Sequence, residues 1–264
     1  MATNLLIGYP QIATDSTLTP SSAFNSAYPE TNLVYGARTD LAQLDTADTE
    51  SSIVYDAGTA SARQIDFVYI AKANILKAQG SKRAGLSGST DDVTYTEIAL
   101  NTAGLQTCTL YGPDAQDLIF TAELPGYTDG SLPDAISYRY YKAEFAGSGT
   151  CPSKRYSCSK IMFGQWFDFG RDPEWSAFSS RPLESGARNP YTFSFTWQGI
   201  TPSIKNSAED LLFSYKERGV ILYTRDYHAP LLDYRAIHAF VTSYDLFPIT
   251  DGSWNITINF EEQI

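Results

Sequence analysis

Alternation of large apolar residues with polar ones is the feature that most constrains the fold of this chain. An apolar residue fills every second position from 191 to 197 and again from 254 to 260. A period of two matches a β-strand, whose successive side chains point to opposite faces of a sheet. Both runs therefore predict half-buried strands. The apolar members are Tyr191, Phe193, Phe195, Trp197, Trp254, Ile256, Ile258 and Phe260.

Shorter strand signals, separated by turn residues, run through the rest of the chain. They predict strands at 53–55, 64–70, 93–98, 137–145, 160–164, 220–223 and 236–244, a loop at 84–92 and a turn at 125–130. Short strands with turns between them and no helical crossovers favour an antiparallel sandwich.

One helix is predicted in the second half of the chain. Ser207 is a candidate N-cap with Asp210 three residues later, and Gly219 follows as a stop signal. One apolar stripe at helical spacing consists of Ala208, Leu211, Leu212 and Tyr215.

The chain of 264 residues is long enough for two modest domains, and the strand pattern changes near residues 169–173. We therefore expect an all-β protein with two parts. Residues 1–168 are predicted to form a jelly-roll β-sandwich. Residues 169–264 are predicted to form a smaller β-sandwich with one flanking α-helix.

Composition excludes several classes of function. The net charge of −11, without any basic run, argues against a nucleic-acid reader, because phosphate contacts need clustered Lys and Arg. An acidic surface would still let DNA pass through a channel without binding it.

The first residues lack the features of a signal peptide, and no apolar run is long enough to cross a membrane. The aromatic content of 14% suits sheets and adhesive surfaces.

No catalytic set is evident. The chain has two histidines, His228 in a predicted loop and His238 on a predicted strand, where we expect it to be partly exposed. Nucleophile-elbow, zinc-protease, phosphate-loop and dinucleotide motifs are absent from the sequence. We therefore predict that the protein is not an enzyme and uses no cofactor and no metal.

Two further sets of polar residues leave alternatives open. Cys151 and Cys158 could pair, although reduced thiols are expected in a chain made in the cytoplasm, and Cys108 has no partner in either case. Asp91 and Asp92 are interpreted as turn residues, with a calcium-binding loop as the alternative.

Aromatic residues near the start of the chain form the candidate binding site. Exposed rings with nearby polar groups can stack on sugars, and the best candidates are Tyr28, Asn32, Tyr35 and Arg38. The alternative is that these residues form a contact between subunits, a use common for tyrosine. The sequence is compatible with both the glycan site and the subunit contact. Of the two, we expect the subunit contact.

Several short segments, in this order, resemble the discoidin or galactose-binding-like jelly roll. They are 4–5, 21–22, 28–33, 53–58, 65–70, 86–92, 138–142 and 161–164. The turn at 28–33 (YPETNL) is similar to the family's YP-x-x-NL turn, and 138–142 (YRYYK) to its RY-containing strand. The resemblance covers about residues 1–165. The chain lacks the family's tryptophan near Arg38 and its terminal disulfide.

A jelly roll followed by a small β-rich domain with one helix is similar in outline to virion proteins of tailed bacteriophages. This resemblance implies a structural component of the tail, of the distal-tail, tail-tip or baseplate type. It implies a homo-oligomeric ring, other tail proteins as partners, and location in the virion after synthesis in the host cytoplasm. The alternative function is a carbohydrate-binding module for host-surface glycans. A hydrolase subunit is the third alternative.

Overall fold

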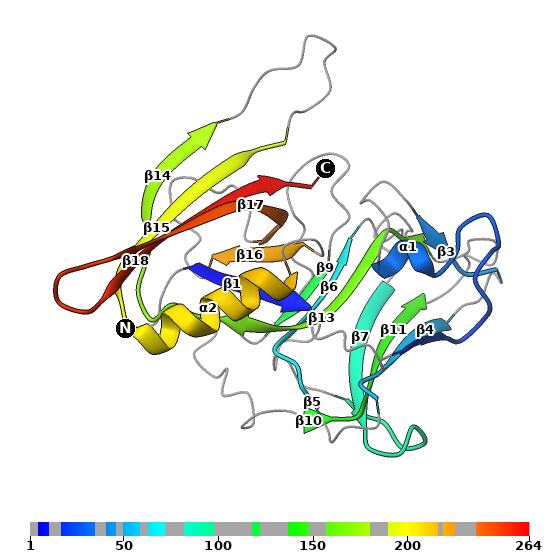
Figure 1. Cartoon of the computed structure of the whole chain (residues 1–264). Coiled ribbons are helices and arrows are strands. Elements are labelled where there is room, and N and C mark those ends of the chain that lie inside the picture. Colours follow the sequence, from blue (N-terminus) through cyan, green and yellow to red (C-terminus); the bar gives the residue numbers. More distant parts are fainter. Residues whose placement is uncertain are drawn as a thin grey trace, which may run out of the picture. The chain divides into compact units, whose positions relative to one another are not determined.

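The computed structural model describes twelve segments of the chain: 5–10, 17–34, 41–45, 50–58, 63–71, 82–97, 118–121, 137–147, 157–179, 190–215, 219–224 and 236–263 (Figure 1). They form two compact units. Unit 1 consists of Met1–Pro10 and Trp166–Ile264, and unit 2 of Gln11–Gln165. The predicted turn at 125–130 lies outside the described residues.

Unit 2 is built from two facing layers of antiparallel strands. The five-stranded layer has the order β2 (Thr17–Pro20), β4 (Glu50–Asp56), β11 (Tyr140–Gly147), β7 (Lys82–Ser89) and β8 (Thr96–Glu97). The other layer has the order β13 (Lys160–Phe167), β6 (Phe67–Ala71) and β9 (Leu118–Thr121). Smaller elements are α1 (Thr31–Val34), β3 (Ala42–Gln43), β5 (Arg63–Gln64), β10 (Ser137–Tyr138) and β12 (Ser157–Cys158).

The core of unit 2 lies between these layers. Tyr55 and Tyr141 of the five-stranded layer and Ile70 and Phe163 of the other belong to one buried apolar cluster. The rings of Tyr55 and Phe163 stack with their centroids 4.9 Å apart. The neighbouring strands β4, β11 and β7 are far apart in the sequence, as in jelly rolls, where Greek-key connections bring distant strands together. The predicted jelly-roll sandwich is confirmed for this unit.

The prediction of a loop at 84–92 is wrong in its first part. Residues 82–89 form β7, which pairs with β11 along its whole length. Small residues explain the difference. The ring of Tyr138 lies against Gly88, where an added Cβ would come 2.2 Å from a ring carbon. Gly88, one of the residues that indicate a loop in the sequence, makes room for an aromatic ring, and the turn begins only after Ser89.

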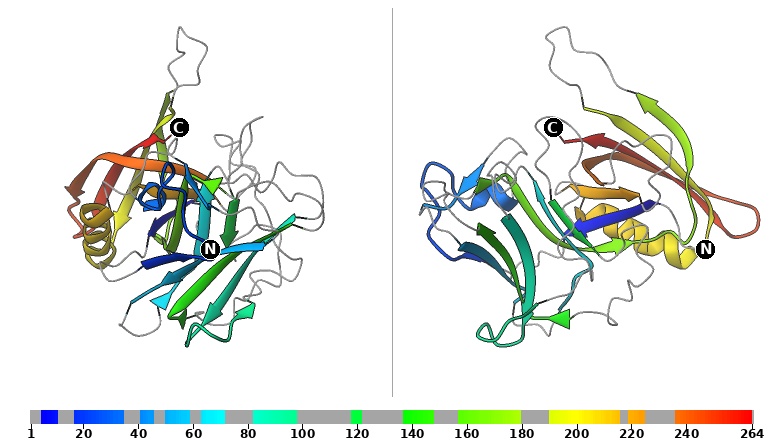
Figure 2. Two further views of the ribbon diagram at one scale, coloured as in Figure 1. Left: turned by 90° about the vertical axis from the view of Figure 1, so that its right-hand side faces the viewer. Right: turned by 180° about the vertical axis from the view of Figure 1, so that it is seen from behind.

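Unit 1 consists of one sheet and one long helix. The strand order is β14 (Glu174–Ser179), β15 (Thr192–Ile200), β18 (Trp254–Glu262), β17 (Ala236–Pro248), β16 (Val220–Thr224) and β1 (Leu5–Pro10). Helix α2 (Pro202–Tyr215) covers one face of this sheet (Figures 1 and 2). The described strands thus form a single sheet where the sequence predicts a sandwich. The all-β class with one flanking helix is confirmed.

The alternating residues of β15 and β18 build the core of unit 1. Phe193, Phe195 and Trp197 are buried, and they lie opposite Phe260, Ile258 and Ile256 of β18. Ala208, Leu211 and Leu212 of α2 belong to the same cluster. The period-two pattern therefore predicts both the strands and the face that each one buries.

The helix begins five residues before the predicted N-cap. Thr201 precedes α2, and its hydroxyl accepts a hydrogen bond from the backbone N–H of Ile204 at 3.4 Å. Ser207 lies inside the helix and is exposed. Pro202 explains the error, because proline fits the first turn of a helix, where its missing N–H would have no partner. Of the predicted stripe, Ala208, Leu211 and Leu212 are buried, and the side chain of Tyr215 lies outside the described part. None of the described helices is long and apolar enough to cross a membrane.

His238 is buried, not partly exposed as predicted from its place opposite the apolar face of its strand. The backbone of β17 pairs with β16 at this point, with His238 opposite Ile221. Gly219 leaves room for the imidazole, since a Cβ there would lie 2.4 Å from Nε2. The other histidine, His228, lies outside the described residues.

The first strand of the chain belongs to unit 1. Leu5 to Gly8 of β1 pair with β16, and Leu5, Leu6 and Ile7 are buried. The sequence places residues 1–168 in the first domain, whereas the structure groups residues 1–10 with 166–264. Pairing between segments so distant in the sequence leaves no local signal, which is why the pattern does not reveal it.

Replacing Leu212 by alanine should lower the free energy of unfolding by about 2–5 kcal/mol, because a buried leucine loses its contacts and leaves a cavity. Urea unfolding followed by tryptophan fluorescence measures this in unit 1, where all four tryptophans lie. Ser207→Ala is the matched control on the same helix and should change stability by less than about 0.5 kcal/mol. A loss of about 1 kcal/mol in the control would mean that Ser207 caps the helix after all.

Candidate functional site

Polar and aromatic side chains gather at one end of the five-stranded layer of unit 2. We call this set the sheet-face cluster; its members are Asp56, Asp92, Tyr95, Arg139, Tyr140 and Lys142. The register of the sheet brings its parts together. Tyr140 of β11 lies between Asp56 of β4 and Ser89 of β7, and the turn that holds Asp92 and Tyr95 follows Ser89.

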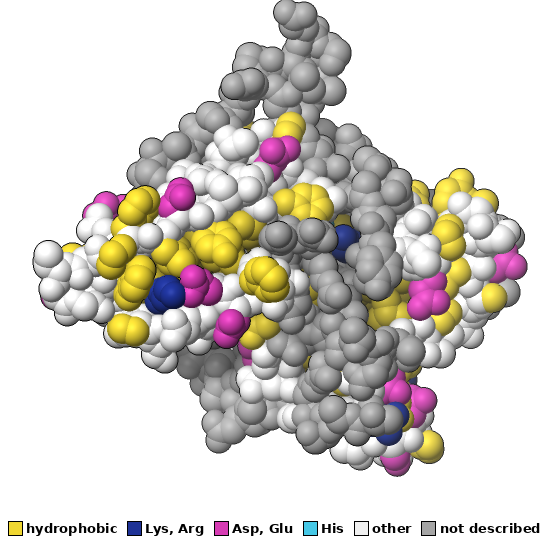
Figure 3. Space-filling model, in the orientation of Figure 1, with side chains coloured by type: hydrophobic (Ala, Val, Ile, Leu, Met, Phe, Trp, Pro, Cys, Tyr) yellow, Lys and Arg dark blue, Asp and Glu magenta, His cyan; other side chains and the backbone are white. Residues whose placement is uncertain are grey.

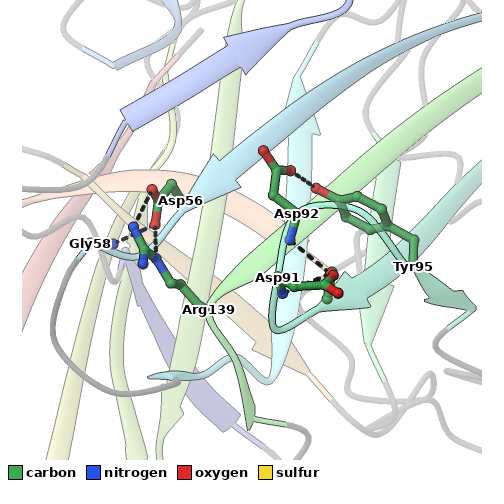
Figure 4. A network of polar contacts seen from close by, with 7 residues as sticks. Asp56, Gly58, Asp91, Asp92, Tyr95 and Arg139 are labelled. Carbon is green, nitrogen blue, oxygen red and sulfur yellow. Dashed lines mark hydrogen bonds and ion pairs between the residues drawn. The ribbon is translucent and has the colours of Figure 1, made fainter.

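An ion pair fixes one side of the cluster. Nε and Nη2 of Arg139 donate to the two carboxylate oxygens of Asp56, at 3.0 and 3.1 Å (Figure 4). Asp56 also accepts a hydrogen bond of 2.9 Å from the backbone N–H of Gly58. The guanidinium beside Asp56, and then this backbone bond, hold the pKa of the Asp56 carboxyl below its usual value. The carboxylate is therefore ionised and held in one orientation.

A tight turn fixes the other side. The carboxylate of Asp91 accepts hydrogen bonds from the backbone N–H groups of Val93 at 3.0 Å and Thr94 at 2.9 Å, and from the hydroxyl of Ser89 at 2.9 Å. These bonds lower the pKa of Asp91. The interpretation of Asp91 as a turn residue is confirmed. Within the described part of the chain, no group of three or more His, Cys, Asp or Glu side chains could hold a metal ion.

Tyr95 and Asp92 connect the turn to the sheet. The hydroxyl of Tyr95 donates a hydrogen bond to Oδ1 of Asp92. Burial, and then this bond and the nearby carboxylate charges, raise the pKa of Tyr95. The hydroxyl therefore stays protonated at physiological pH and acts as a permanent donor to Asp92.

Two cations lie over two tyrosine rings. Nζ of Lys142 is 4.2 Å from the ring centroid of Tyr95, and Cζ of Arg139 is 4.7 Å from that of Tyr140. Both distances are within the range of cation–π attraction. Tyr95, Tyr140, Lys142 and Arg139 are all half-buried. The cluster thus presents aromatic and charged groups together, in fixed positions, at the surface.

The structure describes two of the four residues of the predicted glycan platform, Tyr28 and Asn32. Tyr28 is exposed at 43%, and its backbone is held by hydrogen bonds with Asn25 and Gln43. Nδ2 of Asn32 donates to the carbonyl of Leu41 at 2.8 Å, so this amide ties α1 to the next segment of the chain. Tyr35 and Arg38 lie outside the described residues.

Two other aromatic residues near the start of the chain, and one cysteine, have structural positions. Phe24 packs against the core of unit 2 and Tyr9 against that of unit 1, each partly buried. Cys158 is a free, buried thiol whose pKa is raised by burial to about 12, so it is unreactive. Cys151 and Cys108 lie outside the described residues.

No local pattern in the sequence predicts the sheet-face cluster, although one signal points toward it. Tyr140 and Lys142 are two positions apart on a strand and therefore share a face. What places Asp56, Asp92 and Tyr95 beside them is the pairing of β11 with β4 and β7. That register cannot be read from any local pattern.

Of three comparisons with known proteins, one found similar proteins, and these are solved structures. No family model matches the chain, and no curated protein matches it. Solved structures similar to it include a family 32 carbohydrate-binding module from a Clostridium perfringens family 31 glycoside hydrolase, at 16% identity, a TM-score of 0.39 and coverage of 59% of this chain and 97% of that one.

Two further similar structures are also binding modules. The family 32 module of C. perfringens NanJ, in complex with galactose, has 12% identity, a TM-score of 0.38 and coverage of 61% and 99%. A chitosan-binding module of a Paenibacillus sp. IK-5 chitosanase/glucanase has 14% identity, a TM-score of 0.37 and coverage of 61% and 99%. At such TM-scores the likeness determines neither the fold nor the ligand of this chain.

Proposed function

We propose that unit 2 is a carbohydrate-binding module and that its sheet-face cluster contacts the sugar. The observation that carries this proposal is the convergence of hydrogen-bonded charged groups and two tyrosine rings at one end of the sheet. Ligand sites combine apolar and aromatic surface with a few well-placed polar groups that fix orientation.

The chemistry of the cluster suits a sugar. A sugar presents hydroxyl groups that both donate and accept hydrogen bonds, and a C–H face that packs on aromatic rings. Asp56 and Asp92 supply acceptors, Arg139 and Lys142 supply donors, and the tyrosines supply the rings. Because these groups hold one another in place, binding would cost little side-chain entropy.

The cluster favours binding over hydrolysis. Glycosidases use a carboxylic acid whose pKa is raised, so that it can protonate the leaving group. In and beside this cluster the pKa values of Asp56 and Asp91 are lowered, by Arg139 and by backbone N–H groups respectively. Binding without catalysis is therefore part of the proposal.

A glycan array probed with the full chain tests the proposal. The array should carry galactose-, glucose-, fucose- and N-acetylglucosamine-terminated oligosaccharides. We expect saturable binding that free sugar competes away and that Tyr140→Ala abolishes. Tyr28→Ala is the matched control, because Tyr28 is an exposed ring of the same unit outside the cluster. Loss in the control alone would place the site at the platform near Tyr28, and no binding by the wild type would contradict the proposal.

A structural role in a bacteriophage tail is the second candidate function, and exposed apolar side chains on unit 1 favour it. Phe213 of α2 is exposed at 75% and Phe247 of β17 at 56%. Figure 3 has the same orientation as Figure 1. It shows hydrophobic side chains gathered in the region where Figure 1 draws α2 and the β17–β18 hairpin. Such patches are typical of surfaces that associate.

In this role unit 1 would assemble into an oligomeric ring in the virion, and unit 2 would dock partners or host glycans. Sedimentation of the purified chain, alone and with tail proteins encoded beside it, distinguishes the two candidates. Assembly that Phe247→Asp prevents would support the tail role. A monomer under both conditions would contradict it and leave the carbohydrate-binding proposal standing.

A further inference from the structure

Asp92 has a backbone conformation that its residue type disfavours. Its φ is 62°, and it is the only residue other than glycine with a positive φ in the described part of the chain. Aspartate tolerates this left-handed region better than most residues, but glycine adopts it without steric cost. A glycine would therefore suit the backbone at position 92 at least as well.

The hydrogen bonds that hold the turn do not come from the Asp92 side chain. Asp91 accepts from the N–H groups of Val93 and Thr94. The backbone N–H of Asp92 itself donates to the hydroxyl of Ser89 at 3.1 Å. All of these bonds would remain if residue 92 had no side chain. The backbone hydrogen bonds of the turn thus do not require a carboxylate at this position, whose side chain accepts a hydrogen bond from the hydroxyl of Tyr95.

The carboxylate of Asp92 is nevertheless held in place. Its Oδ1 accepts from the hydroxyl of Tyr95, and the other oxygen points away from this bond (Figure 4). The residue is exposed, so the second oxygen is open to solvent. An oriented, exposed acceptor beside two tyrosine rings and two cations is placed to receive a donor from a ligand.

We propose that Asp92 is a specificity-determining residue of the sugar site, whose free carboxylate oxygen accepts a hydrogen bond from a hydroxyl group of the bound sugar. This inference rests on the function proposed above. It explains why an aspartate is used at a left-handed position where glycine would fit without steric cost, because residues in such conformations cluster at functional sites.

The substitution Asp92→Gly distinguishes a role of Asp92 in the stability of the protein from a role in sugar binding. We expect its melting temperature to equal or exceed that of the wild type, because the left-handed conformation is free for glycine. We expect its affinity for the free oligosaccharide with the strongest array signal to fall about 10- to 100-fold, since a hydrogen bond to a charged acceptor is lost. Calorimetric titration of the full chain measures the affinity, and differential scanning calorimetry the stability.

Two further variants make the test specific. Asp92→Asn keeps a side-chain carbonyl oxygen and a residue that tolerates positive φ, so we expect a smaller loss of affinity than in Asp92→Gly. Thr90→Ala alters an exposed residue of the same turn and should change neither quantity. These controls separate loss of the acceptor from general disturbance of the turn.

Each outcome decides the proposal. Unchanged affinity in Asp92→Gly would overturn it while leaving the proposed function intact. A clearly lowered melting temperature in Asp92→Gly would also overturn it, because the carboxylate would then be structural. If the wild type binds no oligosaccharide on the array, the proposed function fails and this inference with it.

Discussion

Replacing Trp197 by alanine should lower the free energy of unfolding by about 3–5 kcal/mol, the largest loss expected in unit 1. Trp197 is fully buried in the middle of β15, and its indole stacks on Phe169 with the ring centroids 4.1 Å apart. It also contacts Phe195, at 6.0 Å between centroids, and lies opposite Ile256 of β18.

Equilibrium unfolding in urea, followed by the fluorescence of the remaining tryptophans, measures this loss. Trp197→Phe is the informative control. The indole Nε1 is buried without a hydrogen-bond partner among the described residues. An unpaired buried donor is unfavourable, so its removal should offset part of the cost of the smaller ring. Equal losses in the two variants would show that the polar atom, and not the packing of the ring, decides the stability of this core.

Phe163→Ala should destabilise unit 2 by a similar amount, about 3–5 kcal/mol. Phe163 is buried in β13 and lies opposite Val68 of β6. Its ring stacks on Tyr55 of the facing layer at an interplanar angle of 12°. The substitution therefore removes a contact that joins the two layers of the sandwich. Loss of this contact should loosen the layers against each other as well as leave a cavity.

Far-UV circular dichroism, compared with tryptophan fluorescence, shows which of the two units Phe163→Ala destabilises. All four tryptophans lie in unit 1, so a transition seen by circular dichroism but absent from fluorescence belongs to unit 2. Val93→Ala is the control, because Val93 is 81% exposed and its loss should change stability by less than about 0.5 kcal/mol. An unchanged circular dichroism transition in Phe163→Ala would contradict the two-layer core.

Much of the fold follows from local patterns in the sequence. The alternation of Phe193, Phe195 and Trp197 predicts the strand and its buried face, because burial on one side of a sheet imposes a period of two. Helix α2 is predicted from Leu211 and Leu212 by the same reasoning at helical spacing. The first residue of α2 is not predicted correctly, because a serine with an aspartate three residues later resembles a helix cap wherever it occurs. The pairing of β1 with β16 has no local signal at all.

The sheet-face cluster lies beyond sequence analysis for a related reason. Asp91 and Asp92 can be recognised as turn residues, but the partner of Asp92 is a tyrosine whose position depends on the turn itself. The pairing of Arg139 with Asp56 joins residues 83 positions apart through the register of β11 and β4. The aromatic residues near Tyr28 attract notice in the sequence because they are close together in the chain. The cluster consists of residues that only the folded sheet brings together.

The discontinuity of unit 1 has a consequence for how the protein is made. Strand β1 leaves the ribosome more than 200 residues before its partner β16. At ordinary rates of translation this interval lasts roughly 10–40 s, long enough for unit 2 to fold while β1 waits. Leu5, Leu6 and Ile7, all buried in the finished molecule, cannot pair with β16 during that time. Until β16 is made, the edge of β1 that pairs with it is open to pairing with another chain, which is the aggregation hazard of an unpaired strand edge.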